Sequence, residues 1–597
     1  MAAAVSGPPG SDSSGPDSPG PDVPDHDAHE LSLRTWVGIV LAAGLLAYAV
    51  SAGNGFLAED LRAIGSPVDG HVESYQQHGP GGLTGWFLTT QATLFGLRPV
   101  PFHAMGLLQH LAASLLLLWA SRRWTDPVTA GLAAGLFAVW PSGSQAVFSI
   151  ASGGELLSAA LLLLAIRLAT WPGRPALQAG AIALAGIAAL QASVQALSLP
   201  LLLLLIHHRQ RHRRLVGPHL ASHLVAYGIA LAWLLWHLPT WSASMALLDP
   251  LTNPLALQPT TSRILLALDG GWTYARLSFW PVSLSADYGF GVIDAAPSLA
   301  TGVWAGVLLA GLVTIAWRYH RRGDLVSMGL LWWAAALLPM SNVVVPTAHA
   351  LSEASLYLPM AGLCLSLAAC VQALVAWVTP TLSRAPGSVT GRVTGCGPSG
   401  ESGHASGHAS GHSLGGWRSP VLWMGATLML LAGSATARRG ADWRTDETLW
   451  ASTLLAAPTS ARAHGALATA LHARGVEIPA EQHYLKAISL YPRYVTAHYN
   501  LGLTLYAQGR WGDALAQFDR TCQLQPQHAA AHLNRGATLY RMGQWMPAAD
   551  AYRQAAELRP VWWVPWLNLA DALRAAGDEE AAAAAMQQAR ELGAVLP

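Results

Sequence analysis

The sequence predicts an all-α protein made of a membrane-embedded helical bundle followed by a helical solenoid. Three observations lead to this prediction. Hydrophobic residues make up 52% of the 597 residues and charged residues only 11%, against about 25% charged in ordinary soluble domains. Long apolar runs recur between residues 35 and 437. After the last run, Pro458, Pro492, Pro526 and Pro560 stand 34 residues apart, which indicates a repeat array.

Composition also limits the function. A net charge of +1 does not predict a nucleic-acid partner. The four cysteines form no CxxC pair, so neither a zinc site nor a disulfide framework is expected. No Gly-rich phosphate loop follows a strand pattern, and no soluble cofactor is firmly indicated. The single lysine, Lys486, among 34 basic residues points to a GC-rich bacterial source.

Residues 1–33 are rich in Pro, Gly, Ser and Asp and have few large apolar groups. Such a segment buries too little apolar surface to offset the entropy of ordering, so we expect a disordered tail. It has no basic start followed by a short apolar core. The first membrane entry, near residue 35, is therefore expected to be an uncleaved anchor.

The membrane part is predicted at 34–379, with a last transmembrane helix at 419–438. Its apolar runs predict about 11 spans. They lie at 35–52, 102–121, 127–141, 155–171, 176–192, 193–207, 218–238, 300–318, 325–341, 353–378 and 419–437. Basic clusters around Arg122, Arg167, 207–214 and Arg318 fall on one side if the N-terminus is inside, as the positive-inside rule requires. This topology places the C-terminus outside.

Two features bear on this topology. The segment 263–281 is apolar but carries Asp269 and Arg276, and counting it as a span would move Arg318 to the outside. We therefore expect a helix that lies at the outer surface or re-enters from it. Arg438 and Arg439, just after the last span, conflict with the scheme because they fall on the outside.

Residues 380–418 are expected to form a Gly/Ser/His-rich cytoplasmic linker. His404, His408 and His412 recur every four residues and could hold a soft metal ion. A flexible loop with a duplicated short repeat is the favoured interpretation, because nothing nearby would make a site rigid.

The solenoid is predicted at 443–597, as four repeats with a leading half-unit at 443–458. A period of 34 residues is that of the tetratricopeptide repeat (TPR), a pair of antiparallel helices. Small residues recur at one position and alanines at a second, with a large side chain at a third. These sets are Ala468, Gly502, Gly536 and Ala570; Ala480, Ala514, Ala548 and Ala582; and Tyr484, Phe518, Tyr552 and Met586.

Asn500, Asn534 and Asn568 are also 34 residues apart. Repeated carboxamides on the concave face suit binding of an extended peptide backbone. The alternative is that each Asn bonds within its own helix pair, and Ala466 interrupts the series in the first repeat. Both interpretations remain open.

Carboxylates gather in the outward loops of the membrane part. Glu59 and Asp60 follow the first span, and Glu155, Asp287 and Glu353 lie at the mouths of later segments. An acidic group at a membrane surface is costly unless paired or used, so this set is a candidate functional site. Glu59 and Asp60 fit a solvated loop pair equally well.

The order of these segments resembles the transmembrane-and-tetratricopeptide-repeat O-mannosyltransferase family and its bacterial relatives. The most specific stretch is RILLALDGGWTYARLSFWPVSLSADY at 263–288, and others are FGLRPVPFHAMGLLQH at 95–110 and ADWRTDETLW at 441–450. The resemblance extends from about residue 35 to the C-terminus.

This resemblance implies a GT-C type membrane glycosyltransferase. It would transfer a sugar, expected to be mannose, from a polyprenyl-phosphate donor to Ser or Thr of a protein presented by an outward TPR domain. It implies that Glu59 and Asp60 are catalytic, with one acting as base. It also implies that donor and acceptor are bound by Glu155, Arg276, Asp287, Glu353 and His103, with Arg62 and Arg98 as further phosphate contacts. A bacterial inner-membrane protein with a periplasmic TPR domain is expected.

Several family positions have lost charged or titratable side chains. Trp140-Pro141-Ser142-Gly143-Ser144-Gln145 replaces a His-Pro-x-His-x-Glu stretch, and Gly153, Val194-Gln195 and Ala354 replace charged residues. Losing cationic partners of a leaving phosphate reduces rates by orders of magnitude. Two hypotheses therefore stand, a divergent glycosyltransferase and a catalytically degenerate membrane-anchored TPR scaffold that binds exported proteins.

Overall fold

A computed structural model describes most of the chain. The described residues are 31–64, 82–171, 174–210, 218–245, 249–290, 292, 299–321, 323–343, 347, 349–383 and 420–594. Most of the predicted tail and linker lies outside them, as do His404, His408 and His412. The regular elements in the described part are all helices, which confirms the all-α prediction.

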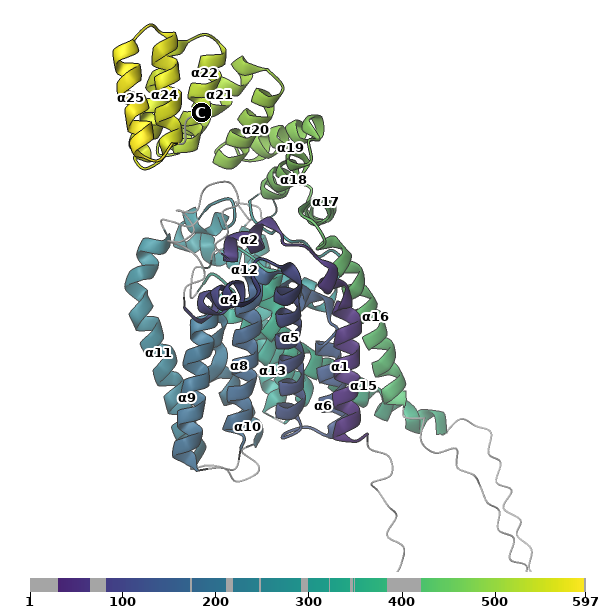
Figure 1. Cartoon of the computed structure of the whole chain (residues 1–597). Helices are drawn as coiled ribbons and strands as arrows, with labels where there is room; N and C mark the ends of the chain where they lie inside the picture. Colours follow the sequence, from purple (N-terminus) through teal and green to yellow (C-terminus); the bar gives the residue numbers. More distant parts are fainter. Residues whose placement is uncertain are drawn as a thin grey trace, which may run out of the picture.

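Fifteen of the helices in Figure 1, together with short 3-10 turns, form the bundle. They are α1 (Leu33–Tyr48), α2 (Ala58–Ile64), α4 (Gly82–Phe95), α5 (Pro99–Ser121), α6 (Pro127–Phe137), α7 (Ser144–Phe148), α8 (Gly153–Ala169), α9 (Pro175–Ala192), α10 (Leu199–Gln210), α11 (Pro218–Met245), α12 (Thr260–Phe279), α13 (Leu299–His320), α14 (Leu325–Leu337), α15 (Tyr357–Ser383) and α16 (Pro420–Asp442). The turns used below are η3 (Pro141–Gly143), η4 (Ile150–Ser152), η5 (Val194–Ser198) and η9 (Glu353–Leu356).

Six helices in the described part are long and apolar enough to cross a membrane, so the chain is a membrane protein. They span Leu33–Ser51, Pro99–Ser121, Ile150–Ala169, Gly302–His320, Glu353–Val378 and Pro420–Asp442. The other five predicted spans correspond to shorter apolar helices, at Pro127–Phe137, Ala176–Ala192, Val194–Arg209, Leu224–His237 and Leu325–Met340. Helix α12 is in neither group, and its position at the outer surface stays a prediction.

Local signals explain where these helices begin and how closely they pack. The side chain of Asp126 accepts a hydrogen bond from the backbone N–H of Thr129 and caps α6, whose first residue is Pro127, a favoured start. A Cβ atom on Gly131 of α6 would lie 2.0 Å from the Trp36 ring of α1. Glycine at this position therefore allows α1 and α6 to approach so closely.

The solenoid begins with a single helix and continues as four helix pairs (Figure 1). Its helices are α17 (Asp446–Ala456), α18 (Ala461–Ala473), α19 (Glu477–Leu490), α20 (Val495–Ala507), α21 (Trp511–Leu524), α22 (Ala529–Arg541), α23 (Trp545–Leu558), α24 (Trp563–Ala575) and α25 (Glu579–Glu591). The turn inside each pair contains a glycine with φ between +73° and +88°, a conformation that other residues rarely adopt. These glycines are Gly475, Gly509, Gly543 and Gly577.

Packing inside the repeats follows the sequence pattern. A Cβ on Gly502 would lie 2.7 Å from the ring of Phe518, and the same distance separates such a Cβ on Gly536 from Tyr552. The recurring alanine Ala514 is fully buried. The predicted TPR solenoid is confirmed.

Candidate functional site

The candidate carboxylates lie where the outward loops of the bundle meet the first solenoid helices. Helix α2, which carries Glu59 and Asp60, lies at the solenoid end of the bundle, close to α17 and α18 (Figure 1). The backbone N–H of Ala58 donates to both carboxylate oxygens of Asp446 in α17, over 3.3 and 3.2 Å. Two parts of the chain that are distant in sequence therefore form one junction.

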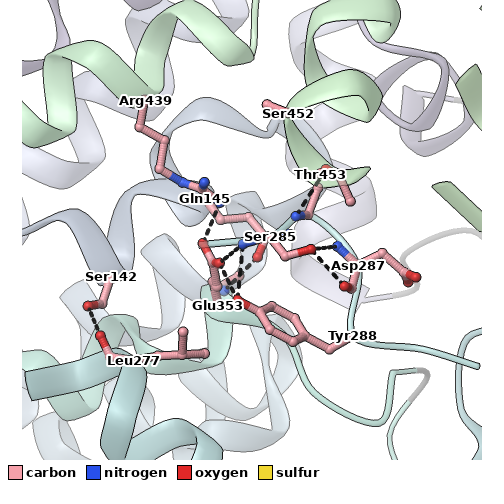
Figure 2. Close-up of polar contacts among 12 residues, drawn as sticks. Ser142, Gln145, Leu277, Ser285, Asp287, Tyr288, Glu353, Arg439, Ser452 and Thr453 are labelled. Atoms are coloured by element: carbon pink, nitrogen blue, oxygen red, sulfur yellow. Dashed lines mark hydrogen bonds and ion pairs between the residues drawn. The ribbon is translucent and has the colours of Figure 1, made fainter. Parts of the chain in front are cut away.

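Glu353 forms the centre of a buried polar cluster at this end of the bundle (Figure 2). Its side chain is fully buried, and Oε2 pairs with Arg439 Nη2 over 2.6 Å. Oε1 accepts hydrogen bonds from the Ser285 N–H over 2.6 Å and from the Tyr288 hydroxyl over 2.7 Å. Arg439 comes from the end of α16. The arginine that conflicted with the predicted topology is thus the partner of a buried carboxylate.

Asp60 is also fully buried, but backbone groups hold it. Oδ2 accepts from the N–H of Leu57 over 3.2 Å, and Oδ1 accepts from the N–H of Ala151 over 3.1 Å. Asp60 therefore ties the start of α2 to the turn η4. Burial raises the pKa of the Asp60 carboxyl to about 6, although these backbone hydrogen bonds oppose the rise.

Asp60→Asn is expected to change how stability depends on pH. The pKa of Asp60 rises from its usual 3.8 to about 6 on folding, so the folded state binds the proton more tightly. Below about pH 4 the group is protonated in both states and adds no cost. As pH rises through 6, the cost of ionising the buried Asp60 carboxyl lowers the free energy of unfolding by up to about 3 kcal/mol.

The measurement is the free energy of unfolding of both proteins in one detergent at about pH 4, 6 and 8. The asparagine variant loses one acceptor at every pH, so only the pH-dependent part of the difference is informative. That difference should move in favour of the variant as pH rises. A difference that stays constant with pH would contradict a raised pKa at Asp60.

Glu59 points to a different partner, in the solenoid. Its carboxylate pairs with Arg462 of α18, and Arg462 Nη1 also lies 3.3 Å from Oδ1 of Asp287. The Ser460 hydroxyl donates to the other Asp287 oxygen over 2.6 Å. The side chain of Glu59 is 36% exposed, whereas that of Asp287 is 2% exposed. We call Glu59, Asp287, Ser460 and Arg462 the junction cluster.

The remaining predicted residues lie outside this cluster of contacts. Arg98 and Arg276 are exposed, and neither pairs with a carboxylate in the described part of the chain. Glu155, in the first turn of α8, is half-buried. His103 is buried, and its Nε2 lies 3.4 Å from the carbonyl of Gly55. The side chain of Arg62 is outside the described residues.

Side chains at the changed family positions bond within the bundle. Gln145 Oε1 accepts from the N–H of Ala354 over 3.1 Å, and Gln195 Nε2 donates to the Ser355 carbonyl over 2.7 Å. The Ser142 hydroxyl donates to the Leu277 carbonyl over 2.6 Å (Figure 2). Two segments that differ from the family pattern, at 140–145 and 194–195, thus hold η9 and the end of α12 in place.

A small pocket lies beside the turn that Asp60 binds. Helices α4, α5 and α8 contribute to its walls, together with Ser149 and Ile150, and its accessible volume is about 20 Å³, room for about one water molecule. Gln91 Oε1 and Gln109 Nε2 are buried there and have no hydrogen-bond partner within the described ranges. A sugar does not fit this pocket without movement of its walls. In the described part of the chain, no group of three or more His, Cys, Asp or Glu residues could hold a metal ion.

Two of the three repeated asparagines bond to the preceding repeat. Asn500 Nδ2 donates to the Thr469 hydroxyl over 3.2 Å, and Asn534 Nδ2 donates to the Tyr499 hydroxyl over 2.8 Å. For Asn568 no such bond exists in the described part of the chain. Peptide binding by this series stays a prediction, and it would use the carbonyl oxygens of Asn500 and Asn534.

The cations of the site were not predicted as site residues from the sequence. Arg439 and Arg462, together with Ser460 and Asp446, come from the last membrane helix and the start of the solenoid. One signal was present, because Arg438 and Arg439 followed the last span on the side where positive charge is disfavoured. The positive charge of Arg439 at this position is explained by its ion pair with Glu353.

Family models and a known protein match parts of the chain. A family model for the TPR repeat matches residues 480–509 and 502–543, and one for the tetratricopeptide repeat matches 533–597. A protein O-mannosyl-transferase of Caenorhabditis elegans is 28% identical over 229 residues, which are 37% of this chain and 27% of the relative. The chain therefore matches about a quarter of that relative's length.

Solved structures match part of the chain. The crystal structure of MamA protein has 20% identity, covers 27% of this chain and 92% of its own, and gives a TM-score of 0.25. A second structure, MamA MSR-1 C2, has 18% identity, covers 24% of this chain and 86% of its own, and gives a TM-score of 0.22.

The fold and the matched regions define a class of protein, a membrane protein that carries a TPR solenoid and is similar over part of its length to a protein O-mannosyl-transferase. The repeat matches and the O-mannosyl-transferase relative together support the TPR O-mannosyltransferase-like family.

Proposed function

We propose that this protein transfers a sugar from a polyprenyl-phosphate donor to a Ser or Thr hydroxyl of a protein held by its solenoid. The observation that carries the proposal is the exposure of Glu59 beside a cation at the junction cluster. Of the three carboxylates that pair with Arg439 or Arg462, that of Glu59 is 36% exposed, whereas Asp287 is 2% exposed and Glu353 is fully buried. A general base must reach the acceptor hydroxyl, and Glu59 is the best placed to do so.

The proposed reaction uses the two members of the Glu59–Arg462 pair separately. The Glu59 carboxylate takes the proton of the acceptor hydroxyl as the hydroxyl oxygen attacks C1 of the sugar. The bond between C1 and the phosphate oxygen breaks, and polyprenyl phosphate leaves with its electron pair. Arg462 turns from Glu59 to the leaving phosphate, because a guanidinium stabilises phosphate oxygens by charge-assisted hydrogen bonds.

The proposed topology follows from the same arrangement. Helix α18 supplies Arg462 to the junction cluster, so an acceptor bound along the solenoid would lie on the same side of the membrane as Glu59. We infer a multi-pass protein of a bacterial inner membrane with its TPR domain in the periplasm.

A second candidate function is a scaffold without catalysis, which binds exported proteins through its TPR groove. The hydrogen bonds of Gln145 and Gln195 favour it, because both side chains serve packing where the family pattern carries charge. The small pocket beside Asp60 favours it as well.

An assay of mannose transfer from polyprenyl-phosphate mannose to a Ser/Thr-containing acceptor protein separates the two functions. Glu59→Gln is expected to lower the rate by about 10²–10⁴, because the amide cannot accept the proton. Glu481→Gln is the matched control, since Glu481 also pairs with an arginine, Arg510, but within the solenoid. The control should transfer at the wild-type rate. A Glu59→Gln rate equal to a measurable wild-type rate would remove Glu59 as base, whereas no transfer by the wild-type protein would leave the scaffold.

A further inference from the structure

A cluster of arginines lies at the end of the bundle opposite the solenoid, where α5 and α8 end and α9 begins (Figure 1). Arg122 and Arg123 directly follow α5, and Arg167 lies in the last turn of α8. We call these three residues the basic cluster. It is far along the bundle from Glu59 and is not used by the proposed reaction.

Arg167 is the most buried member, with 6% of its surface exposed. Its guanidinium carbon lies 4.0 Å from the centre of the Trp119 ring of α5, a cation–π contact. Its Nε is buried and has no hydrogen-bond partner among the described residues. A buried guanidinium with an unused donor is costly for a protein to retain.

The end of α8 does not need Arg167 as a cap. Gln178 of α9 donates through Nε2 to the carbonyls of Leu168 and Ala169, over 3.0 and 2.8 Å. The carbonyl of Arg167 itself accepts from the Thr170 hydroxyl over 2.9 Å. These side chains satisfy the carbonyls that a basic group at a helix C-terminus usually serves.

The other two members increase the positive charge. The Nη1 of Arg122 is buried and lacks a hydrogen-bond partner in the part of the chain that the structure describes, and Arg123 lies close enough to Arg167 for their charges to repel. No member of the basic cluster forms an ion pair with a carboxylate in the described part of the chain. Asp126 follows in sequence, but its oxygens accept from Thr129 and from Gln372 over 2.6–2.9 Å.

A third helix closes over the same loop. Arg209 of α10 donates through Nε and Nη2 to the carbonyl of Trp124, over 3.3 Å in each case. This contact holds the loop after α5 against α10. The donors of Arg122 and Arg167 therefore lie among packed helix ends, and not on freely moving surface side chains.

We propose that the basic cluster binds the phosphate of an anionic phospholipid headgroup. A phosphate offers several acceptor oxygens and at least one negative charge, so it fills the unused donors of Arg122 and Arg167 and relieves the repulsion between Arg123 and Arg167. The cluster lies at a membrane surface, where anionic headgroups are abundant and basic pockets between helix ends select them.

The test uses the full chain purified in neutral detergent and measures thermal unfolding while phosphatidylglycerol, phosphatidylcholine or inorganic phosphate is added. Phosphatidylglycerol should raise the unfolding temperature in a saturable way, and phosphatidylcholine should not. Arg167→Gln and the milder Arg122→Gln should each raise the phosphatidylglycerol concentration needed for half-saturation at least about tenfold, since a hydrogen bond to a charged group is lost.

Arg34→Gln and Arg318→Gln are matched controls, because each removes one positive charge from an exposed side chain in α1 or α13. Both should keep the wild-type response. An equal loss in the controls would overturn the proposal in favour of diffuse surface attraction. Saturation by inorganic phosphate alone, with no further effect of phosphatidylglycerol, would overturn the lipid as source. No response to any of the three would overturn the site itself.

Discussion

Arg439→Leu is expected to destabilise the folded chain by about 3–5 kcal/mol. The variant leaves Glu353 fully buried without the guanidinium that now lies 2.6 Å from its Oε2. Ser285 and Tyr288 still donate to Oε1, but neither carries a positive charge. The expected readout is a loss of monodisperse full-length protein on size-exclusion chromatography in detergent, with a lower unfolding temperature.

A second substitution separates lost charge from lost packing. Adding Glu353→Gln to Arg439→Leu should restore most of the stability, because the amide still accepts from Ser285 and Tyr288 and carries no charge. Arg438→Leu removes the neighbouring arginine and should behave like wild type. If the double variant is as unstable as Arg439→Leu alone, the shape of the arginine side chain matters and the ion pair does not.

Arg462→Ala is expected to release the first solenoid helices from the bundle. The arginine bridges Glu59 and Asp287, and each hydrogen bond to a charged group contributes about 1.5–3 kcal/mol. Without it two carboxylates face each other near a buried site, which adds repulsion. Hydrogen exchange of the backbone amides in α17 and α18 should rise at least about tenfold.

Arg510→Ala is the control for this effect. Arg510 also binds two carboxylates, Glu481 and Asp513, but it is 46% exposed and all three lie within the solenoid. Exposed pairs of this kind contribute about 0–1 kcal/mol. Exchange in α17 and α18 should match wild type in the control. Unchanged exchange in Arg462→Ala would mean that Asp446 and the apolar contacts hold the junction alone.

The solenoid was predictable because its determinants are local. A turn that needs a positive φ, as at Gly509, recurs in every unit, and a close helix approach at a glycine, as at Gly502, recurs at Gly536. The bundle was less predictable from the sequence. Hydropathy located the apolar runs, but it did not predict that 127–141 would be interrupted after Phe137 or that 193–207 would begin with a 3-10 turn. Backbone geometry at Pro141 and Ser193 decides those helix ends.

The candidate site was predictable only in its acidic half. Glu59, Asp60 and Glu353 were identifiable because carboxylates stand out in apolar surroundings. Their partners were not, because Arg439 is 86 residues from Glu353 and Arg462 is 403 residues from Glu59. Hydropathy and repeat spacing carry no information about such long-range pairs. The interior bonds of Gln145 and Gln195 were hidden for the same reason.

The ion pairs of the junction also fix an order of events during synthesis. Glu353 enters the membrane 86 residues ahead of Arg439, so the nascent chain carries an uncompensated carboxylate until α16 has been inserted. Glu59 lacks its arginine partner for still longer, because Arg462 is translated 403 residues later. Domains generally fold from the N-terminus as they emerge. Here the ion pairs of Glu353 and Glu59 can form only after α16 and the start of the solenoid have been made.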